Sequence, residues 1–574
     1  KKRRRAKEGP PEKSNEATPP PPAVQAEAKR IIPEGVDEGF YLECPWLENQ
    51  DTMEQDNIID SSELWSSILE ARGLRDTNQG LTVAGIQEMT QRAVDEGSTD
   101  DLMRLVWALR MVYEPQFNDP DNLKVVVGSA EYQALVQGWL SRGHMAFARH
   151  LTRTCAHERD NGEEGAQGKC LTLADRVFIE KTDGWARLGR ALHVFLSSAL
   201  TVLSSGDSRT SPRQSLVLMR NHIPLLFPFP LLSRRYLSAL LSLLASNDDR
   251  EVLSVAFLRL YELATSQTMP LLHDALKGVY WSYRRAATRS SATVRRKPTD
   301  GGRETGRKNC TLPLLRECVS ELYGVERPSS YLHAFVYIHD LVMTATAAVA
   351  EAKSSGWDSK EAGPALKRAR TKEFVLCLKL WSLILCKHSS GKTDLSPLVT
   401  PLAKALETML HATTSVFAAP LIFQIARMAQ DLAASASIFL PTSPSLLRVI
   451  ELLHSRRGHP CPSGVQSPAA AIKNRPGRMR SKATGEGGGL GGGGGGGVTG
   501  KEEEEEGGGN EADLLGKVWL DKEDLRWGRA HASLMREASY LVVRDAGIYR
   551  YSPGLPEYCS SLLPRLGQVQ KALP

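Results

Sequence analysis

The chain has 574 residues and a net charge of +6, and 41% of its residues are hydrophobic, which supports a sizeable core. No uninterrupted apolar run reaches the roughly 18 residues that span a bilayer, and no secretory signal opens the sequence, so a membrane or secreted protein is not expected. The sequence begins at Lys1 rather than at a methionine, and we expect it to be a fragment of a longer protein.

Residues 1–58 are predicted to be a disordered basic and proline-rich tail. They are rich in Pro, Glu and Lys and poor in large apolar side chains, so burial cannot offset the entropy of ordering. The tail opens with a basic cluster of the nuclear-import type, formed by Lys1, Lys2, Arg3, Arg4 and Arg5.

Residues 59–457 are predicted to form an α-helical repeat domain, because no segment alternates with period two and helical segments recur about every twenty residues. Thr82 is placed to cap the segment that follows it. The segments expected before residue 330 are Glu63–Arg72, Val83–Asp95, Leu102–Tyr113, Val126–Arg142, His144–Thr154, one or two within Leu171–Val202, Leu232–Ala245, Val252–Thr265, Leu271–Arg285 and Leu312–Tyr323.

Basic and aromatic residues meet at the end of the segment Leu271–Arg285. Tyr280 and Trp281 stand beside Arg284 and Arg285, and a basic loop follows that contains Arg295, Arg296 and Lys297. Aromatics beside arginines can stack on unpaired RNA bases, so these five basic residues are candidate nucleic-acid contacts. The alternative is that the aromatics are core residues and the arginines end a helix, and the helical spacing favours that alternative.

The segment from Tyr331 to Leu453 holds four or five apolar stretches of helical length, separated by proline, glycine and short polar breaks. Lys372–Cys386 is apolar on two faces, so it must be covered on both sides and belongs to an inner layer. Such helices predict an all-α, armadillo- or HEAT-like solenoid, with a compact helical bundle as the alternative. Trp357–Ala369 is predicted to be a mobile charged loop. Further helices are expected to start at Pro397, Pro420 and Pro444.

Residues 458–512 are predicted to be a linker, basic at first and then rich in glycine and glutamate, and residues 513–574 a C-terminal segment with two helices, near Trp519–Leu541 and Glu557–Leu573. Within the linker, Gly495, Gly500 and Lys501 mimic a phosphate-binding loop. Glu502 replaces the hydroxyl residue that would hold magnesium, so nucleotide binding is not expected.

Positive charge is concentrated outside the predicted core. Residues 1–30, 284–308 and 456–482 carry net charges of +5, +7 and +7, which leaves −13 for the remainder of a chain of +6. Basic flexible segments on an acidic body suit a polyanion such as nucleic acid. The alternative is that these segments serve only localisation or solubility.

We predict no catalytic residues, no cofactor, no metal site and no small-molecule substrate, and hence no enzyme. The nine cysteines are irregularly spaced without a C-x-x-C pair, which is typical of reduced thiols. The serines lack an elbow motif, and the paired carboxylates lie at loop ends, where capping explains them.

Five short motifs within residues 334–450 carry a resemblance to a known family. In order they are Ala334–Ile338, Leu380–Trp381, Leu395–Pro401, Pro420–Phe423 and Leu440–Ile450. Together they resemble the core of the nucleolar complex protein two family of ribosome assembly. The resemblance covers about residues 60–457 and is clearest over Leu271–Leu453. The segment Tyr551–Leu573 is similar to the closing segment of that family.

The resemblance implies a helical-repeat scaffold of the nucleus, in the nucleolus and nucleoplasm. It implies pairing with the sister nucleolar complex proteins one and three on pre-60S particles, with direct rRNA contact left open. We expect Phe335, Trp381, Phe423 and Phe439 to belong either to the core or to the partner interface. Two alternatives are a transport-factor solenoid and an RNA-binding protein that acts through its basic loops.

Overall fold

All residues that the computed structural model describes belong to one compact unit within residues 46–574. The structure describes residues 82–113, 129–156, 185–204, 211–266, 269–295, 311–359, 362–389, 395–413, 415–457, 515–520 and 528–572. Lys1–Arg5, Glu63–Arg72, the basic loop after residue 295 and the glycine-rich linker lie outside these ranges.

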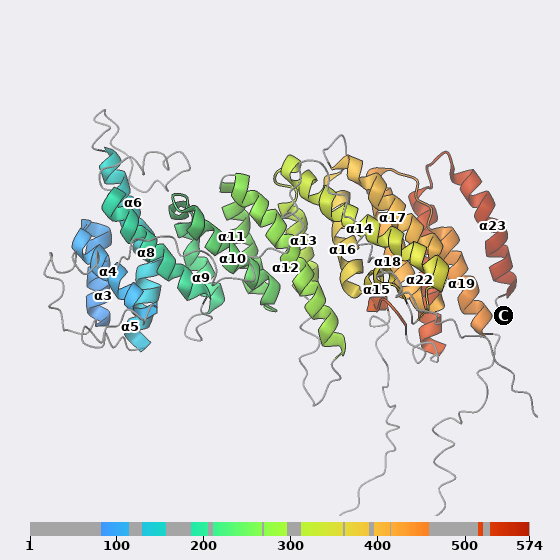
Figure 1. Cartoon of the computed structure of the whole chain (residues 1–574), viewed down its shortest axis with the longest axis horizontal. Coiled ribbons are helices and arrows are strands. Elements are labelled where there is room, and N and C mark those ends of the chain that lie inside the picture. The colour runs from blue at the N-terminus through green and yellow to red at the C-terminus, as the bar shows by residue number, and fades with distance from the viewer. Residues whose placement is uncertain are drawn as a thin grey trace, which may run out of the picture. The chain divides into compact units, whose positions relative to one another are not determined.

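The described residues form helices and contain no strand, which confirms the all-α fold (Figure 1). The first half comprises α3 (Val83–Gln91), η3 (Arg92–Glu96), α4 (Thr99–Tyr113), α5 (Ser129–Gln133), η5 (Ala134–Trp139), α6 (Leu140–Ala156), α8 (Trp185–Ser204), α9 (Pro212–Leu218), η7 (Met219–Leu226), α10 (Pro230–Ser246), α11 (Arg250–Ser266) and α12 (Met269–Arg295). The second half comprises α13 (Thr311–Leu322), α14 (Arg327–Ser355), α15 (Pro364–Ala369), α16 (Lys372–His388), η9 (Ser396–Leu398), α17 (Val399–Ala412), η10 (Val416–Ala418), α18 (Ala419–Ala436), α19 (Ser443–Arg457), α22 (Gly528–Ile548) and α23 (Leu555–Ala572).

Helices pack mainly against helices that are near them in sequence, as expected for a helical-repeat solenoid. Helix α10 packs against α11 and α12, α14 against α15 and α17, and α16 against α18. The predicted inner helix α16 also contacts α12 and α13, and its Phe374, Leu378 and Trp381 are buried. Its apolar faces are therefore covered, as the sequence predicted.

Local sequence signals set several helix boundaries. The Thr82 hydroxyl accepts a hydrogen bond from the amide of Gly85 at 3.2 Å, and Thr371 caps α16 in the same way through the amide of Phe374 at 3.2 Å. Pro364 and Pro420 lie in the first turns of α15 and α18, where a missing amide hydrogen costs nothing. The predicted cap at Thr82 is thus confirmed.

The break expected between Arg142 and His144 is absent, because α6 runs through Gly143. A Cβ atom at Gly143 would lie 2.8 Å from the ring of Phe195 in α8. The glycine therefore serves close packing between α6 and α8 rather than a turn.

Two further boundaries were predicted wrongly. Helix α12 continues ten residues beyond Arg285 to Arg295, because the following stretch contains no proline or glycine and Ala287 is buried. The segment Trp357–Ala369, expected to be a loop, contains α15. Trp357 and Leu366 are buried, and the carboxylate of Glu351 accepts the amide of Leu366 at 2.8 Å.

The C-terminal helices dock on the end of the repeat array, where α22 packs against α18 and α19, and α23 against α19. The buried Gln430 of α18 donates to the carbonyl of Leu541 at 2.8 Å. The carboxylate of Asp545, near the end of α22, accepts hydrogen bonds from the amides of Thr442 at 3.1 Å and Ser443 at 2.8 Å. The helix predicted near Trp519–Leu541 begins later, at Gly528.

Candidate functional site

Helix α14 presents a mainly apolar face to solvent. Leu332, Phe335, His339 and Met343 follow a helical spacing that places them on one face. Leu332 is 38% exposed and Met343 is 49% exposed, while Phe335 and His339 are half-buried. The Phe335 ring stacks on His339 and on Tyr331, with ring centroids 6.1 Å apart in both pairs. This face is available for contact with another molecule.

The opposite side of α14 is held by a buried aromatic cluster. The rings of Tyr337 in α14 and Tyr280 in α12 stack with their centroids 4.0 Å apart. Trp381 in α16 lies 5.1 Å, centroid to centroid, from Tyr323, which directly follows α13, and Tyr323 donates a hydrogen bond to the carbonyl of Leu276 at 3.0 Å. These contacts join α12, the end of α13, α14 and α16, so they fix the orientation of the exposed face of α14.

A histidine pair lies beside this cluster. A ring nitrogen of His333 lies 3.0 Å from one of His273. Burial, together with smaller contributions from the nearby charges of His273 and Lys277, lowers the pKa of His333 to about 3. His333 is therefore neutral at physiological pH. The two histidines are 60 residues apart, and no sequence signal singled them out. The described residues contain no group of three or more side chains placed to hold a metal ion.

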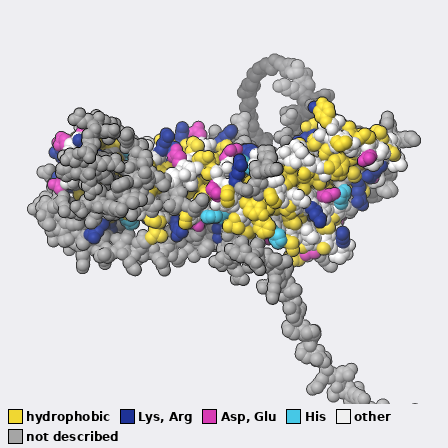
Figure 2. Space-filling view, turned by 90° about the horizontal axis from the view of Figure 1, so that it is seen from above, with side chains coloured by type: hydrophobic (Ala, Val, Ile, Leu, Met, Phe, Trp, Pro, Cys, Tyr) yellow, Lys and Arg dark blue, Asp and Glu magenta, His cyan; other side chains and the backbone are white. Residues whose placement is uncertain are grey.

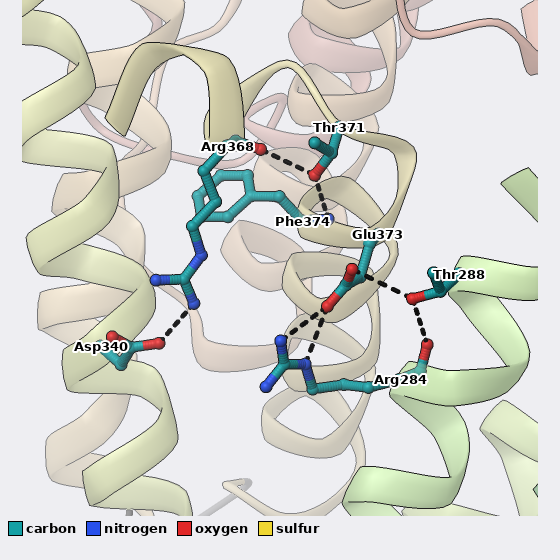
Figure 3. Close-up of polar contacts among 7 residues, drawn as sticks. All are labelled: Arg284, Thr288, Asp340, Arg368, Thr371, Glu373 and Phe374. Atoms are coloured by element: carbon teal, nitrogen blue, oxygen red, sulfur yellow. Dashed lines mark hydrogen bonds and ion pairs between the residues drawn. The ribbon is translucent and has the colours of Figure 1, made fainter. Parts of the chain in front are cut away.

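Figure 3 shows the polar junction between α12 and α16. The Arg284 guanidinium donates two hydrogen bonds to one carboxylate oxygen of Glu373, at 2.9 and 2.7 Å, and Thr288 donates to the other oxygen at 3.1 Å. The same guanidinium lies 4.4 Å from the ring centroid of Trp281. Arg368 donates to Asp340 at 2.7 Å and thereby joins α15 to α14.

Of the five predicted nucleic-acid contacts, the structure describes the side chains of Arg284 and Arg285. Arg284 is engaged by Glu373, and Arg285 lies half-buried next to it in the middle of α12. Arg295 is the last residue of α12, and its side chain lies outside the description, as do Arg296 and Lys297. Nucleic-acid contact through these residues stays a prediction.

The four aromatic candidates for core or interface divide into two groups. Trp381 and Phe423 are fully buried in α16 and α18, so they are core residues. Phe335 lies on the exposed face of α14. Phe439, between α18 and α19, is 55% exposed, and its ring lies 4.8 Å from that of Tyr549, centroid to centroid. The four residues therefore do not form one common surface.

Among the described helices, α14 is long and apolar enough to cross a bilayer by length and composition. Polar residues interrupt its apolar residues, so α14 contains no uninterrupted apolar run of that length. In its most apolar window, 56% is buried inside the protein. Two packed sides together with an exposed apolar face account for this hydropathy.

The space-filling view shows hydrophobic side chains gathered on the right, the end of the molecule that holds the C-terminal helices (Figure 2).

Comparison with known proteins points to one family. The model of the Noc2p family matches residues 305–475, a range that includes α13 to α19. The chain is 25% identical over 280 residues to a nucleolar complex-associated protein 2 of Arabidopsis thaliana, which covers 49% of this chain and 33% of the relative. It is 23% identical over 281 residues to a nucleolar complex protein 2 of Drosophila melanogaster, with 49% and 33% covered.

An uncharacterised NOC2 family protein of Schizosaccharomyces pombe is 21% identical over 298 residues, which are 50% of this chain and 38% of the relative. The matched part thus spans about a third of the length of these relatives. The five short motifs within residues 334–450 fall inside the range of the family model, and the closing segment Tyr551–Leu573 lies outside it. The resemblance to the nucleolar complex protein two family is therefore confirmed, and residues 305–475 are the part of the chain that matches the Noc2p family model.

Proposed function

We propose that the chain is a non-enzymatic scaffold in the assembly of the large ribosomal subunit. In this role it pairs with the sister nucleolar complex proteins one and three on pre-60S particles. It acts in the nucleolus and nucleoplasm and aids maturation and intranuclear transport of the particles. The family match and the names of the relatives support a role in a nucleolar complex, and the helical array suits a scaffold.

The observation that carries the pairing proposal is the exposed face of α14, which lies within the range matched by the family model. Between Arg327 and Lys353 this face carries no Lys, Arg, Asp or Glu side chain, so it does not suit RNA phosphates. It suits the apolar face of a helix from a sister protein.

Two substitutions on this face, Phe335→Asp and Met343→Asp, test the pairing. Each places a charge in the centre of the surface, where an unpaired buried charge would oppose docking. Tagged chains purified from nuclear extract should lose the sister protein and the pre-60S particles, while the melting temperature of the purified chain stays unchanged.

The matched control is Leu258→Asp in α11, because Leu258 is 52% exposed and lies outside the range of the family model. It should retain both partners. Equal retention of the sister protein by the control and the two α14 variants would refute the assignment of this face.

A further inference from the structure

A basic cavity of about 580 Å³ lies between α13, α16, α18 and α22. Its lining includes Arg316, Lys379, Arg427 and Arg544, and a single acidic residue, Asp431. The remaining described lining residues are uncharged. A cavity of this volume is within the range of ligand-binding sites in proteins.

Two of the four cations are already neutralised by carboxylates. Arg427 pairs with Glu537, and Arg544 pairs with Asp431. These pairs bridge α18 and α22, so they hold the two helices together and shape one wall of the cavity. Their charges do not require a ligand.

The other two cations are poorly compensated. The closest carboxylate of Arg316 is that of Glu317 at 3.7 Å, and Glu317 also accepts Lys387 at 2.8 Å. The Nε atom of Arg316 is buried without a hydrogen-bond partner. Lys379 forms no ion pair among the described residues. Desolvation lowers its pKa, as do the charges of Arg316 and Arg427, whereas Asp431 opposes the shift. An anion in the cavity would relieve this repulsion.

We propose that this cavity binds the carboxylate side chains of an acidic protein segment, with Lys379 and Arg316 as the main contacts. Guanidinium and ammonium groups in a partly desolvated site bind carboxylates through charge-assisted hydrogen bonds. Single-stranded RNA is disfavoured, because such sites combine a groove along the backbone with aromatic platforms, and the described lining contains no aromatic residue. The site is separate from the α14 face and holds whether or not the pairing proposal does.

Binding of a fluorescent hexaglutamate peptide to the full chain, followed by anisotropy at low salt, tests the proposal. Lys379→Gln should weaken binding about tenfold, and Lys379→Glu should weaken it more, because one charge-assisted contact is lost or reversed. Lys404→Gln in α17 is the matched control, because Lys404 is an exposed lysine of a neighbouring helix that does not line the cavity. Melting curves check that all variants fold.

The chain contains a run of five glutamates of its own, Glu502–Glu506. The assay is therefore repeated with these residues changed to glutamine, so that competition by the chain cannot hide binding of the peptide. Peptide binding that depends on Lys379 in either background supports the proposal. Binding that is absent or equal in the Lys379 and Lys404 variants in both backgrounds overturns it. A single-stranded RNA oligonucleotide that binds through Lys379, where the peptide does not, also overturns it.

Discussion

The buried carboxylate of Asp545 joins the C-terminal helices to α19, and we predict that Asp545→Ala releases them. One carboxylate oxygen accepts the amides of Thr442 and Ser443, the hydroxyl of Ser443 at 2.6 Å and the hydroxyl of Tyr558 in α23. Asp545 is fully buried. The substitution leaves all four donors without this acceptor.

The cost follows from these contacts. A buried donor left without a partner costs about 1–3 kcal/mol, and removal of the carboxylate recovers part of its own desolvation penalty. The net loss should therefore be about 3–5 kcal/mol. Asp545→Asn keeps an acceptor oxygen and should cost less, about 1–2 kcal/mol.

Native-state hydrogen exchange measures this loss locally, which suits a long repeat array that need not unfold in one step. A loss of about 3 kcal/mol raises the opening constant roughly hundredfold, so the amides of α22 and of Ser443 should lose about two decades of protection. Asp431→Ala is the matched control, because its carboxylate is 53% exposed and its ion pair should contribute less than about 1 kcal/mol. Unchanged protection in Asp545→Ala would refute the reasoning.

Three further predictions concern the repeat core. Trp381→Ala should lower the free energy of unfolding of its region by about 3–5 kcal/mol, measured by denaturant titration, and a loss below about 1 kcal/mol would contradict its core placement. Because the folded pKa of His333 is lowered to about 3, the unfolded chain binds more protons below pH 6.5, so this residue reduces stability as pH falls. His333→Gln should flatten the pH dependence of stability between pH 6.5 and 4.5 by about 1.4 kcal/mol per unit, and an unchanged slope would contradict this. Gly363→Ala places a Cβ atom 2.4 Å from the Glu351 carboxylate, which accepts the amide of Leu366 and so caps α15. The substitution should destabilise α15 by about 1 kcal/mol, measured by hydrogen exchange. Undiminished protection of the α15 amides would contradict this role of Glu351.

Apolar periodicity was enough to predict α14, α16 and α18, because each carries buried stripes at helical spacing and starts next to a threonine or proline signal. The same logic failed at Gly143 and at α15. A glycine signals a turn in sequence, but Gly143 serves close packing against Phe195. Leu366 is the only leucine in a charged stretch, and its burial depends on packing against α14, which no local pattern reveals.

The exposed face of α14 was predictable only in part. The sequence singled out Phe335. Leu332 and Met343 could be recognised as exposed apolar residues only once the structure showed that the other sides of the helix are buried. The contacts of Asp545 with Thr442 and Ser443 join residues 103 and 102 positions apart, and the basic cavity is lined by residues of four helices. Such long-range juxtapositions leave no periodic trace in the sequence, so they required the structure.

The most direct test of the scaffold proposal is gradient sedimentation of the tagged chain from nuclear extract, with identification of the proteins and RNA that travel with it. The proposal predicts co-migration with large-subunit precursors and a sister nucleolar complex protein. Sedimentation as a free chain, or only with import cargo, would contradict it.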